Sequence, residues 1–312
     1  MNVFRCVKNN GDSKTLQRGS VRLTWPLMGG FVVWLVGLCG TAAASCDSTC
    51  GRGGLGECTE IAAPIYHAEE PTDDAYYFTR LLRLALDLTA DEYGSYCLKP
   101  PTVYFSDDRL KASLQQGQVD VIWLVTDKAS EREMHAIHVP LLGELNHYRM
   151  LLIRRGDESK FAAVQTLEDL QGLTGGMNAQ WVDANIMAKN GLPYVAVTGY
   201  GKLFRMLAAG RFDYFSRGIH QITSELYFYP ELDLAIEPHI LLKYPSYTYF
   251  FVRRDDPALA ERLLLGLTRA RQTGQFAALY QSIPRFQWAE QQLNSEQRKV
   301  INLERDWADA AP

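Results

Sequence analysis

The chain has 312 residues, of which 47% are hydrophobic and 22% charged, and its formal net charge at pH 7 is −4. This composition is typical of a globular protein with one large core or two smaller ones, and it excludes a chain that is mainly disordered. The first 44 residues hold five basic residues and one acidic residue, so the rest of the chain is more acidic still. An acidic surface argues against nucleic acid as the partner.

The N-terminal segment has the pattern of a secretory signal. Basic residues from Arg5 to Arg22 precede an uncharged apolar run, and three alanines stand before Ser45. This order predicts a signal peptide at 1–44, cleaved before Ser45, and an exported, periplasmic protein. The uncharged stretch from Leu23 to Cys46 is also long enough to span a bilayer, so an uncleaved anchor is the alternative.

Four cysteines lie beyond residue 44, and an even number in an oxidising compartment predicts two disulfides. Cys58 and Cys97 open two predicted strands that are neighbours in a βαβ unit. We therefore expect Cys58 to pair with Cys97, and Cys46 with Cys50. Zinc binding is a weaker alternative because the spacing is not that of a zinc knuckle. A lipid anchor on Cys46 is a further alternative, although the residues before it are a poor signal for acylation.

After residue 58, short apolar runs alternate with amphipathic helices, which is the pattern of an α/β protein. The first half predicts strands at 60–66, 98–105 and 119–125 and helices at 75–88 and 107–116. Ser106 is a suitable N-cap for the helix 107–116, and Gly117 ends it in the left-handed conformation that glycine adopts most easily.

The second half repeats this alternation. It predicts strands at 148–155, 173–181, 194–198 and 212–216 and helices at 166–173, 181–190 and 201–209. Two strand-like runs, 232–242 and 246–254, then precede a helix at 257–272 with a proline at its start. A late strand followed by closing helices indicates that the chain returns to its first half. We expect the polar tail from Trp288 to lie on the surface.

One pattern occurs twice, in LQQGQVDVIW (114–123) and LAAGRFDYFS (207–216). In each copy a predicted helix ends at a glycine, Gly117 or Gly210, and a buried strand begins near an aspartate, Asp120 or Asp213. The repeat predicts equivalent corners in two similar lobes. Chance is the alternative, because a glycine followed by an apolar strand is common in α/β proteins.

The order of several segments resembles a known family. VDVIWLVTDKASER, HVPLL, YRMLLIRRGD, TLEDLQGLTGG, GRFDYFSRG and the C-terminal TYFFVRRDDPALAERLLLGLTRARQTGQFAALY are similar to the family 3 extracellular solute-binding proteins of the polar amino acid type. The resemblance covers most of residues 59–285. Its single motifs are loose, but their order and spacing are fairly specific.

The resemblance implies a type II periplasmic-binding-protein-like clamshell, in which two crossing strands join two α/β lobes around a ligand cleft. Residues 59–146 plus 244–290 would form one lobe, 147–243 the other, and 291–312 a C-terminal tail. Hinges are expected near residues 145–148 and 243–246. The implied protein is a monomer that captures a small polar or anionic solute, an amino acid or a carboxylate, by cleft closure. Its partner would be an ABC permease or a membrane sensor.

The resemblance also implies ligand-binding residues. The ligand-carboxylate arginine of the family stands twelve positions after the strand-opening aspartate, here Asp120, which gives Arg132. A guanidinium suits a carboxylate because its planar fork of donors matches the two oxygens. A surface arginine is the alternative. Backbone NH groups at a helix N-terminus would hold an anionic part of the ligand at Asn178, Ala179 and Gln180.

The chain departs from the family where amino-acid binders hold the ligand ammonium. An acidic residue is expected five positions after Asp213, and this chain has Gly218, preceded by Arg217. Two arginines in the cleft favour an anionic ligand over a zwitterion. Arg217 is open to a second interpretation, as the partner of a structural carboxylate. An ammonium partner could also come from Glu69, Glu70 or Asp74, so an amino acid is not excluded.

Five aromatic residues are expected at the rim of the cleft, where they would stack on the ligand or cap it. We expect only a minority of them to contact ligand, with Tyr66, Trp123 and Trp181 preferred over Tyr76 and Tyr200.

The sequence gives no sign of a metal, a cofactor or a catalytic set. His135 and His138 are three positions apart, and extended structure would place them on opposite faces. The segment GGMNAQ lacks the lysine and hydroxyl residue of a P-loop. Some relatives of the family resemble dehydratases that act on cyclic carboxylic acids. An enzyme of that kind, with Glu69 or Glu70 as general acid, is therefore the alternative to a binding protein.

Overall fold

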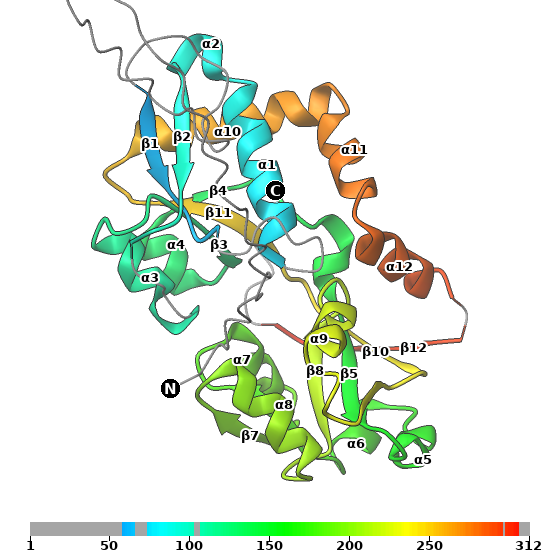
Figure 1. The fold of residues 1–312 in the computed structure, drawn as a ribbon. Coiled ribbons are helices and arrows are strands. Elements are labelled where there is room, and N and C mark those ends of the chain that lie inside the picture. Colours follow the sequence, from blue (N-terminus) through cyan, green and yellow to red (C-terminus); the bar gives the residue numbers. More distant parts are fainter. Residues whose placement is uncertain (1–57, 66–73, 103–106, 296, 306–312) are drawn as a thin grey trace, which may run out of the picture. The chain divides into compact units, whose positions relative to one another are not determined.

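A computed structural model describes residues 58–65, 74–102, 107–295 and 297–305 (Figure 1). The chain divides into two units, Met1–Ser45 and Cys46–Pro312, and all described residues belong to the second. The predicted signal peptide lies outside the described residues, as do Cys46, Cys50, Tyr66, Glu69, Glu70 and Ser106. Within the described ranges, no helix has the length and apolar character that crossing a membrane requires.

The first half of the chain builds two small sheets, which we call lobe 1 together with the helices around them. β1 (Thr59–Ala62) and β2 (Tyr96–Lys99) are parallel, and α1 (Asp74–Asp87) and α2 (Ala90–Tyr93) lie between them in sequence. β2 ends earlier than predicted, directly before Pro100 and Pro101, because proline has no NH for a strand ladder.

The second sheet of lobe 1 has three antiparallel strands. Its order is β3 (Val121–Val125), β11 (Thr248–Val252) and β4 (His135–Ile137). α3 (Asp107–Gln115) precedes β3, and α4 (Lys128–Glu133) connects β3 to β4. The Asp127 carboxylate caps α4 by accepting a hydrogen bond from the Ser130 NH at 2.7 Å. The late strand β11 returns to the first half of the chain, as predicted.

Lobe 2 has a mixed sheet of seven strands in the order β12-β10-β5-β8-β6-β7, with β9 also paired to β5. Its elements are β5 (Tyr148–Arg154), α5 (Glu158–Ala162), α6 (Leu167–Leu170), β6 (Gly175–Asn178), α7 (Val182–Lys189), β7 (Tyr194–Val197), α8 (Tyr200–Ala208), β8 (Tyr214–Gly218), α9 (Ile222–Phe228), β9 (Leu234–Ile236) and β10 (Ile240–Lys243). The run 232–242 gives two strands because the Glu237 carboxylate binds the NH groups of His239 and Ile240 between them.

The C-terminal part continues from lobe 1 into the sheet of lobe 2. α10 (Pro257–Gln272), α11 (Gln275–Gln281) and α12 (Pro284–Leu293) follow one another and lead to β12 (Lys299–Asn302), drawn from orange to red in Figure 1. β12 pairs with β10, and Ile301 and Leu303 are buried. The tail that we expected on the surface is therefore partly buried. Two apolar residues at alternate positions are too short a pattern to indicate a strand.

Two crossovers connect the lobes, from η1 (Gly143–His147) into β5 and from β10 into β11. They run side by side: Tyr148 faces Lys243 across the ladder, and the Tyr244 NH donates to the His147 carbonyl at 3.0 Å. Asn146 Nδ2 also donates to Ser246 Oγ at 3.2 Å. These paired segments lie where the sequence predicts the hinges.

The repeated motif forms the same corner in both lobes. Gly117 and Gly210 have φ of +69° and +68°, as predicted for helix-ending glycines. Asp120 exchanges two hydrogen bonds with Ala62, from its NH at 2.7 Å and to its carboxylate at 2.8 Å. Asp213 exchanges the same two bonds with Thr174, at 2.7 and 2.9 Å. In each corner the aspartate thus fixes the start of a buried strand against a neighbouring segment.

The cysteine pairing predicted within lobe 1 is wrong. Cys97 is disulfide-bonded, whereas Cys58 is a free, exposed thiol. The register of β1 with β2 gives the reason, because Glu60 and not Cys58 faces Cys97. Two residues along a strand and one strand spacing separate the Cα atoms of Cys58 and Cys97 by about 8 Å. That separation is beyond the reach of a disulfide. The partner of Cys97 lies outside the described residues.

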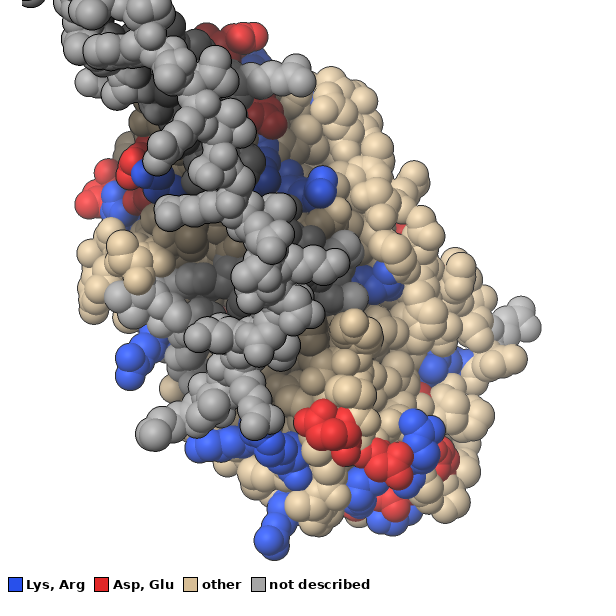
Figure 2. Space-filling view, viewed as in Figure 1, with Lys and Arg blue, Asp and Glu red and all other residues tan. Residues whose placement is uncertain are grey.

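Charged side chains of both signs are intermixed on the face drawn in Figure 2, over the end of lobe 2 that carries α5 and α6. They form local ion pairs there: Arg154 and Lys160 lie 2.5 and 3.1 Å from Asp157, and Arg155 lies 2.8 Å from Asp233. Few charges lie over α11 and α12 on this face. The charges of α5 and its surroundings therefore give no field of one sign.

Candidate binding site at the carboxyl edge of the lobe 2 sheet

The carboxyl ends of β6, β7 and β8 lie at one edge of the lobe 2 sheet, because β6 runs parallel to both neighbours. Three side chains extend from these ends: Trp181 after β6, Tyr200 after β7 and Arg217 near the end of β8. The rings of Trp181 and Tyr200 are 6.1 Å apart. Ligands of open α/β sheets bind outside the carboxyl ends of the strands. This edge is therefore the candidate site.

Arg217 is the central residue of the site. Its guanidinium carbon lies 4.6 Å from the Trp181 ring and 4.9 Å from the Phe215 ring, which is the geometry of a cation–π contact. Its Nε donates to Glu225 Oε1 at 2.7 Å, and its Nη2 donates to Gln221 Oε1 at 3.2 Å. The second interpretation of Arg217, as the partner of a structural carboxylate, therefore describes part of its role.

The Arg217–Glu225 pair is shielded from solvent, since Arg217 is 7% and Glu225 3% exposed. The Tyr200 hydroxyl also donates to Glu225 Oε1, at 2.8 Å. Burial, the largest single influence, would lower the pKa of Arg217, but Glu225, Tyr200 and Asp183 together outweigh it and raise the pKa above its usual value. Arg217 therefore stays charged. Its Nη1 makes no hydrogen bond to another described residue, so this donor is available to a bound group.

A second buried ion pair, between Arg149 and Asp183, connects the site to the crossovers. Arg149 is 4% exposed, and its Nε donates to Asp183 Oδ1 at 2.9 Å. Its Nη1 donates to the Asn146 carbonyl at 2.7 Å, and the Tyr244 hydroxyl donates to Asp183. Burial alone would raise the pKa of Asp183, but Arg149 and Tyr244 outweigh it and hold the pKa below its usual range. Asp183 therefore stays ionised.

His220 lies just after β8 and is 5% exposed. Its ring is 6.4 Å from that of Phe286 in α12. Burial, together with Arg149, Arg285 and Arg217, lowers the pKa of His220 well below its usual value, and only Asp183 among the leading influences raises it. His220 is therefore neutral near pH 7, and the charge around it is predominantly positive.

Two buried polar atoms of this region have no hydrogen-bond partner among the described residues, His220 Nδ1 and Glu225 Oε2. Most buried polar atoms in proteins have a partner, in the protein or in ordered water. These two atoms are therefore candidates for contacts with a solute or with water.

The predicted NH groups already have acceptors within the chain. The Ala179 NH donates to the Val197 carbonyl at 3.0 Å, and the Gln180 NH donates to Asn178 Oδ1 at 3.0 Å. The Trp181 NH donates to the Asn178 carbonyl at 3.1 Å. A role of residues 178–180 in holding an anion stays a prediction, and it requires these donors to be shared with the ligand.

Arg132 and Trp123 lie apart from this network. The Arg132 side chain is 76% exposed at the end of α4, 4.0 Å from Glu133. The Trp123 ring stacks on Phe78 at 5.3 Å in the core of lobe 1. Among the described residues, no hydrogen bond, ion pair or ring contact joins either one to Arg217 or Trp181. Ligand binding by Arg132 and Trp123 stays a prediction, as does that by Tyr66 outside the described ranges.

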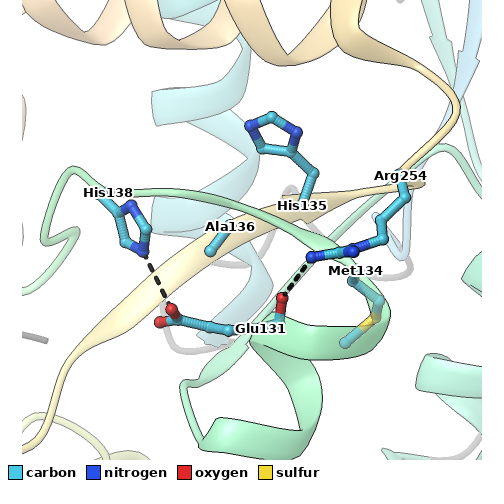
Figure 3. A pocket seen from close by; sticks show the side chains of 6 residues that line it. All are labelled: Glu131, Met134, His135, Ala136, His138 and Arg254. Atoms are coloured by element: carbon cyan, nitrogen blue, oxygen red, sulfur yellow. Dashed lines mark hydrogen bonds and ion pairs between the residues drawn. The ribbon is translucent and has the colours of Figure 1, made fainter.

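Both histidines of the pair in lobe 1 line a pocket of about 400 Å³ beside α4 and β4 (Figure 3). They lie on opposite faces, as expected: His135 is opposite Val252 in the ladder, whereas the His138 ring contacts Tyr249, the neighbour of Phe250 on the other face, at 5.3 Å. His138 Nε2 lies 3.2 Å from Glu131 Oε2. No group of three or more His, Cys, Asp or Glu side chains is placed to hold a metal within the described ranges.

Sequence reasoning missed much of the charged network, because its members are far apart in the chain. Arg149 offered one signal, as a charged residue within an otherwise apolar strand. Asp183 and Glu225 stand on the short helices α7 and α9, and a carboxylate on a helix is usually exposed to solvent. Only the fold shows that these carboxylates are buried next to arginines.

No family model and no curated protein matches this chain. Solved structures do match. A histidine kinase sensor domain with similarity to periplasmic binding proteins is 20% identical, with a TM-score of 0.54, over 73% of this chain and 96% of that one. An arginine-specific periplasmic binding protein of Salmonella typhimurium is 17% identical, with a TM-score of 0.53, over 72% of this chain and 99% of that one.

A third match is an ancestral amino acid-binding protein, a precursor of cyclohexadienyl dehydratase. It is 14% identical, with a TM-score of 0.51, over 72% of this chain and 95% of that one. At such identities the matches bear on the fold, and they agree with the two lobes and the two crossovers described above. The chain has the two-lobed, type II α/β fold of periplasmic binding proteins.

Proposed function

We propose that this protein binds a small solute at the carboxyl edge of the lobe 2 sheet. The observation that carries the proposal is the convergence of Trp181, Tyr200 and Arg217 at that edge, next to the paired crossovers. Aromatic faces and one available guanidinium donor are suited to holding a small polar molecule. Structures of this fold include an ancestral arginine-binding protein bound to arginine, 15% identical with a TM-score of 0.52, which supports solute binding.

The solute we propose carries an acidic group, as a carboxylate does. Arg217 has a donor at Nη1 that makes no hydrogen bond to another described residue. Arg149, Arg285 and Arg217 all lower the pKa of His220, although Asp183 and Glu225 are paired with the first and the last of them. Gly218 leaves no room for an acidic side chain, because a Cβ there would lie 2.7 Å from the His220 ring. Glu225 Oε1 is already held by Arg217 and Tyr200, whereas Oε2 has no hydrogen-bond partner among the described residues and would accept a hydrogen bond from a neutral donor of the solute, such as a hydroxyl. The Arg217 donor at Nη1 and Gly218 are the observations that favour an anion over a zwitterion.

We further propose that binding closes the lobes by a hinge motion at the two crossovers, with residues 147–243 moving as one lobe. The protein would be exported to the periplasm and would hand its solute to a permease or a sensor. Both kinds of partner have a structural neighbour, a substrate-binding protein of an amino acid ABC transporter and a histidine kinase sensor domain. The binding proteins among the matched structures support a role without chemistry, so we expect the solute to be released unchanged.

A thermal-shift screen of the chain against dicarboxylates, cyclic carboxylates and amino acids tests the proposal. A solute at a hundredfold its Kd adds about 2.7 kcal/mol of stability, because it binds the folded state alone. For a protein of this size that is a rise in Tm of roughly 4 to 5 °C. We expect this rise with carboxylate anions. Chromatography of the recovered compound checks that it has not been converted.

The matched variant is Arg217→Gln combined with Glu225→Gln, which removes both charges and leaves neither one buried alone. We expect it to abolish the shift, whereas Arg211→Gln, an exposed arginine of the same lobe, keeps it. A shift with neutral amino acids only would contradict the acidic-group assignment. No shift with any compound would contradict solute binding of these classes.

A further inference from the structure

The C-terminal segment Lys299–Arg305 is firmly attached to lobe 2. β12 pairs with β10 in register over four residues, and the Leu303 NH donates to the Lys243 carbonyl at 2.8 Å. Glu304 exchanges two hydrogen bonds with the Asn190 side chain at the end of α7, both of 2.8 Å. Buried Ile301 and Leu303 belong to the core of lobe 2. The segment therefore moves with lobe 2.

The next side chain, that of Arg305, reaches back out of lobe 2. Its Nη1 donates to the Pro245 carbonyl at 2.7 Å, within the second crossover. Its Nη2 donates to the Thr126 carbonyl at 2.6 Å, directly after β3 of lobe 1. A guanidinium is suited to this role, because its planar fork holds two acceptors at a fixed separation. One side chain thus connects the last strand of lobe 2 to a strand end of lobe 1.

The helix before this segment also contacts both lobes. Phe286 and Ala289 of α12 are fully buried, and the Phe286 ring faces His220 of lobe 2. In Figure 1, α12 lies between the helices of lobe 1 and the strand β12. The C-terminal part therefore passes from lobe 1 to lobe 2 through packed contacts and ends in hydrogen bonds that return to lobe 1.

We propose that the segment from α12 to Arg305 is a third connection between the lobes, and that Arg305 is a positioning residue that restrains the hinge. Lobe separation at the two crossovers breaks the bond to Thr126 as long as β12 stays in the lobe 2 sheet. Arg305 also interacts electrostatically with Asp183, Tyr244 and Arg149, which connect the candidate site to the crossovers. The restraint therefore favours one geometry of the site over more open arrangements.

The expected effect of Arg305 on solute affinity rests on the proposed function. A binding-competent arrangement that is only partly populated lowers the apparent affinity in proportion to its population. Loss of the Arg305 bonds should therefore weaken solute binding without removing a ligand contact. The restraint itself is measurable without a solute, so the two proposals succeed or fail separately.

The test is the distance between the lobes in the full chain without solute. Spin labels are attached to Arg109→Cys on α3 and Ser159→Cys on α5, two exposed positions, in a background where Cys58 and every other cysteine that forms no disulfide is replaced by serine. Double electron–electron resonance then gives the distribution of distances. We expect Arg305→Ala to raise the population of separated lobes by about tenfold, because the bond to the Thr126 carbonyl, which has a charged donor, no longer opposes separation. Arg305→Lys keeps one donor group and should restore part of the original distribution.

Arg211→Ala is the control for the loss of an arginine and should leave the distances unchanged. A merely local role of Arg305 would lower stability without moving the distances, so an Arg305→Ala distribution equal to the original would overturn the proposal. Arg305→Met, which keeps the apolar stem and loses every donor, is the second variant should Arg305→Ala fail to fold. A Met variant with unchanged distances would likewise overturn the proposal.

Discussion

His220 is buried in its neutral form among arginines, and this has a consequence for stability. Burial and the cations Arg149, Arg285 and Arg217 lower its pKa in the folded chain. The unfolded chain has an ordinary histidine with a pKa of about 6.5. As the pH falls below that value, His220 of the unfolded chain becomes protonated, whereas buried His220 of the folded chain stays neutral. The contribution of His220 is therefore complete above about pH 6.5 and decreases below it.

We predict that the free energy of unfolding decreases less steeply between pH 7 and 5 in His220→Gln than in the parent chain. Urea titrations at several pH values measure this slope. His239→Gln, at an exposed histidine, is the control and should keep the parental slope. The Asp183 carboxylate is not a source of this slope, because its lowered pKa affects stability only below about pH 4. Equal slopes for parent and His220→Gln would contradict the burial of a neutral His220.

At the residue scale, the sequence indicated two residues of the candidate site, and it did not indicate which carboxylates pair with the arginines there. Trp181 and Arg217 are both expected ligand residues, and the structure brings them into contact. The carboxylate of Glu225 was not foreseen, because its burial depends on how α9 packs after β8. Arg132, selected from spacing alone, is exposed, since the loop and helix after β3 turn its side chain to solvent.

At the scale of elements, the two glycine corners are the clearest case of a prediction from pattern. Both glycines have positive φ, and both aspartates bind a neighbouring segment through an NH and a carboxylate oxygen. An arginine supports each corner: Arg253 lies 3.0 Å from Asp120, and Arg154 lies 3.7 Å from Asp213. The motif is repeated because both lobes begin a buried strand in the same way.

We predict that Gly117→Ala and Gly210→Ala each lower the free energy of unfolding by about 1 to 2 kcal/mol, the cost of a left-handed alanine. Space is not the cause, because an added Cβ would meet only the arginine side chains at 3.7 and 3.9 Å. The two positions lie in different lobes, so the costs should add in the double variant. Urea unfolding of the three variants checks this. A neutral effect at one corner only would contradict their equivalence.

The sequence pattern did not indicate the strand β12 or the correct disulfide of Cys97. β12 has four residues and one short alternation, and its assignment depends on the free edge of β10, which lies far away in the sequence. The disulfide of Cys97 was misassigned because strand neighbours were predicted without their register. Periodicity thus predicts which segments are strands and leaves open how they align.

At the scale of the whole molecule, the repeated corner and the alternation of strands and helices predicted two similar lobes, and the resemblance to solute-binding proteins implied the two crossovers between them. The third connection was not predicted, because it depends on single contacts of Arg305. The function that we propose at this scale is the coupling of a solute to the relative motion of the lobes. In that proposal the crossovers act as the hinge, and the buried Arg149–Asp183 pair lies between the crossovers and the candidate site.

The central claim is that Arg217 and its neighbours bind an acidic solute, and a calorimetric titration tests it most directly. The carboxylate with the largest thermal shift is titrated into the parent chain, the Arg217→Gln, Glu225→Gln double variant and Arg211→Gln. Loss of a hydrogen bond from a charged donor should raise Kd in the double variant by tenfold or more, about 1.4 kcal/mol, with Arg211→Gln unchanged. Equal Kd values in all three proteins would contradict the account and place the solute elsewhere.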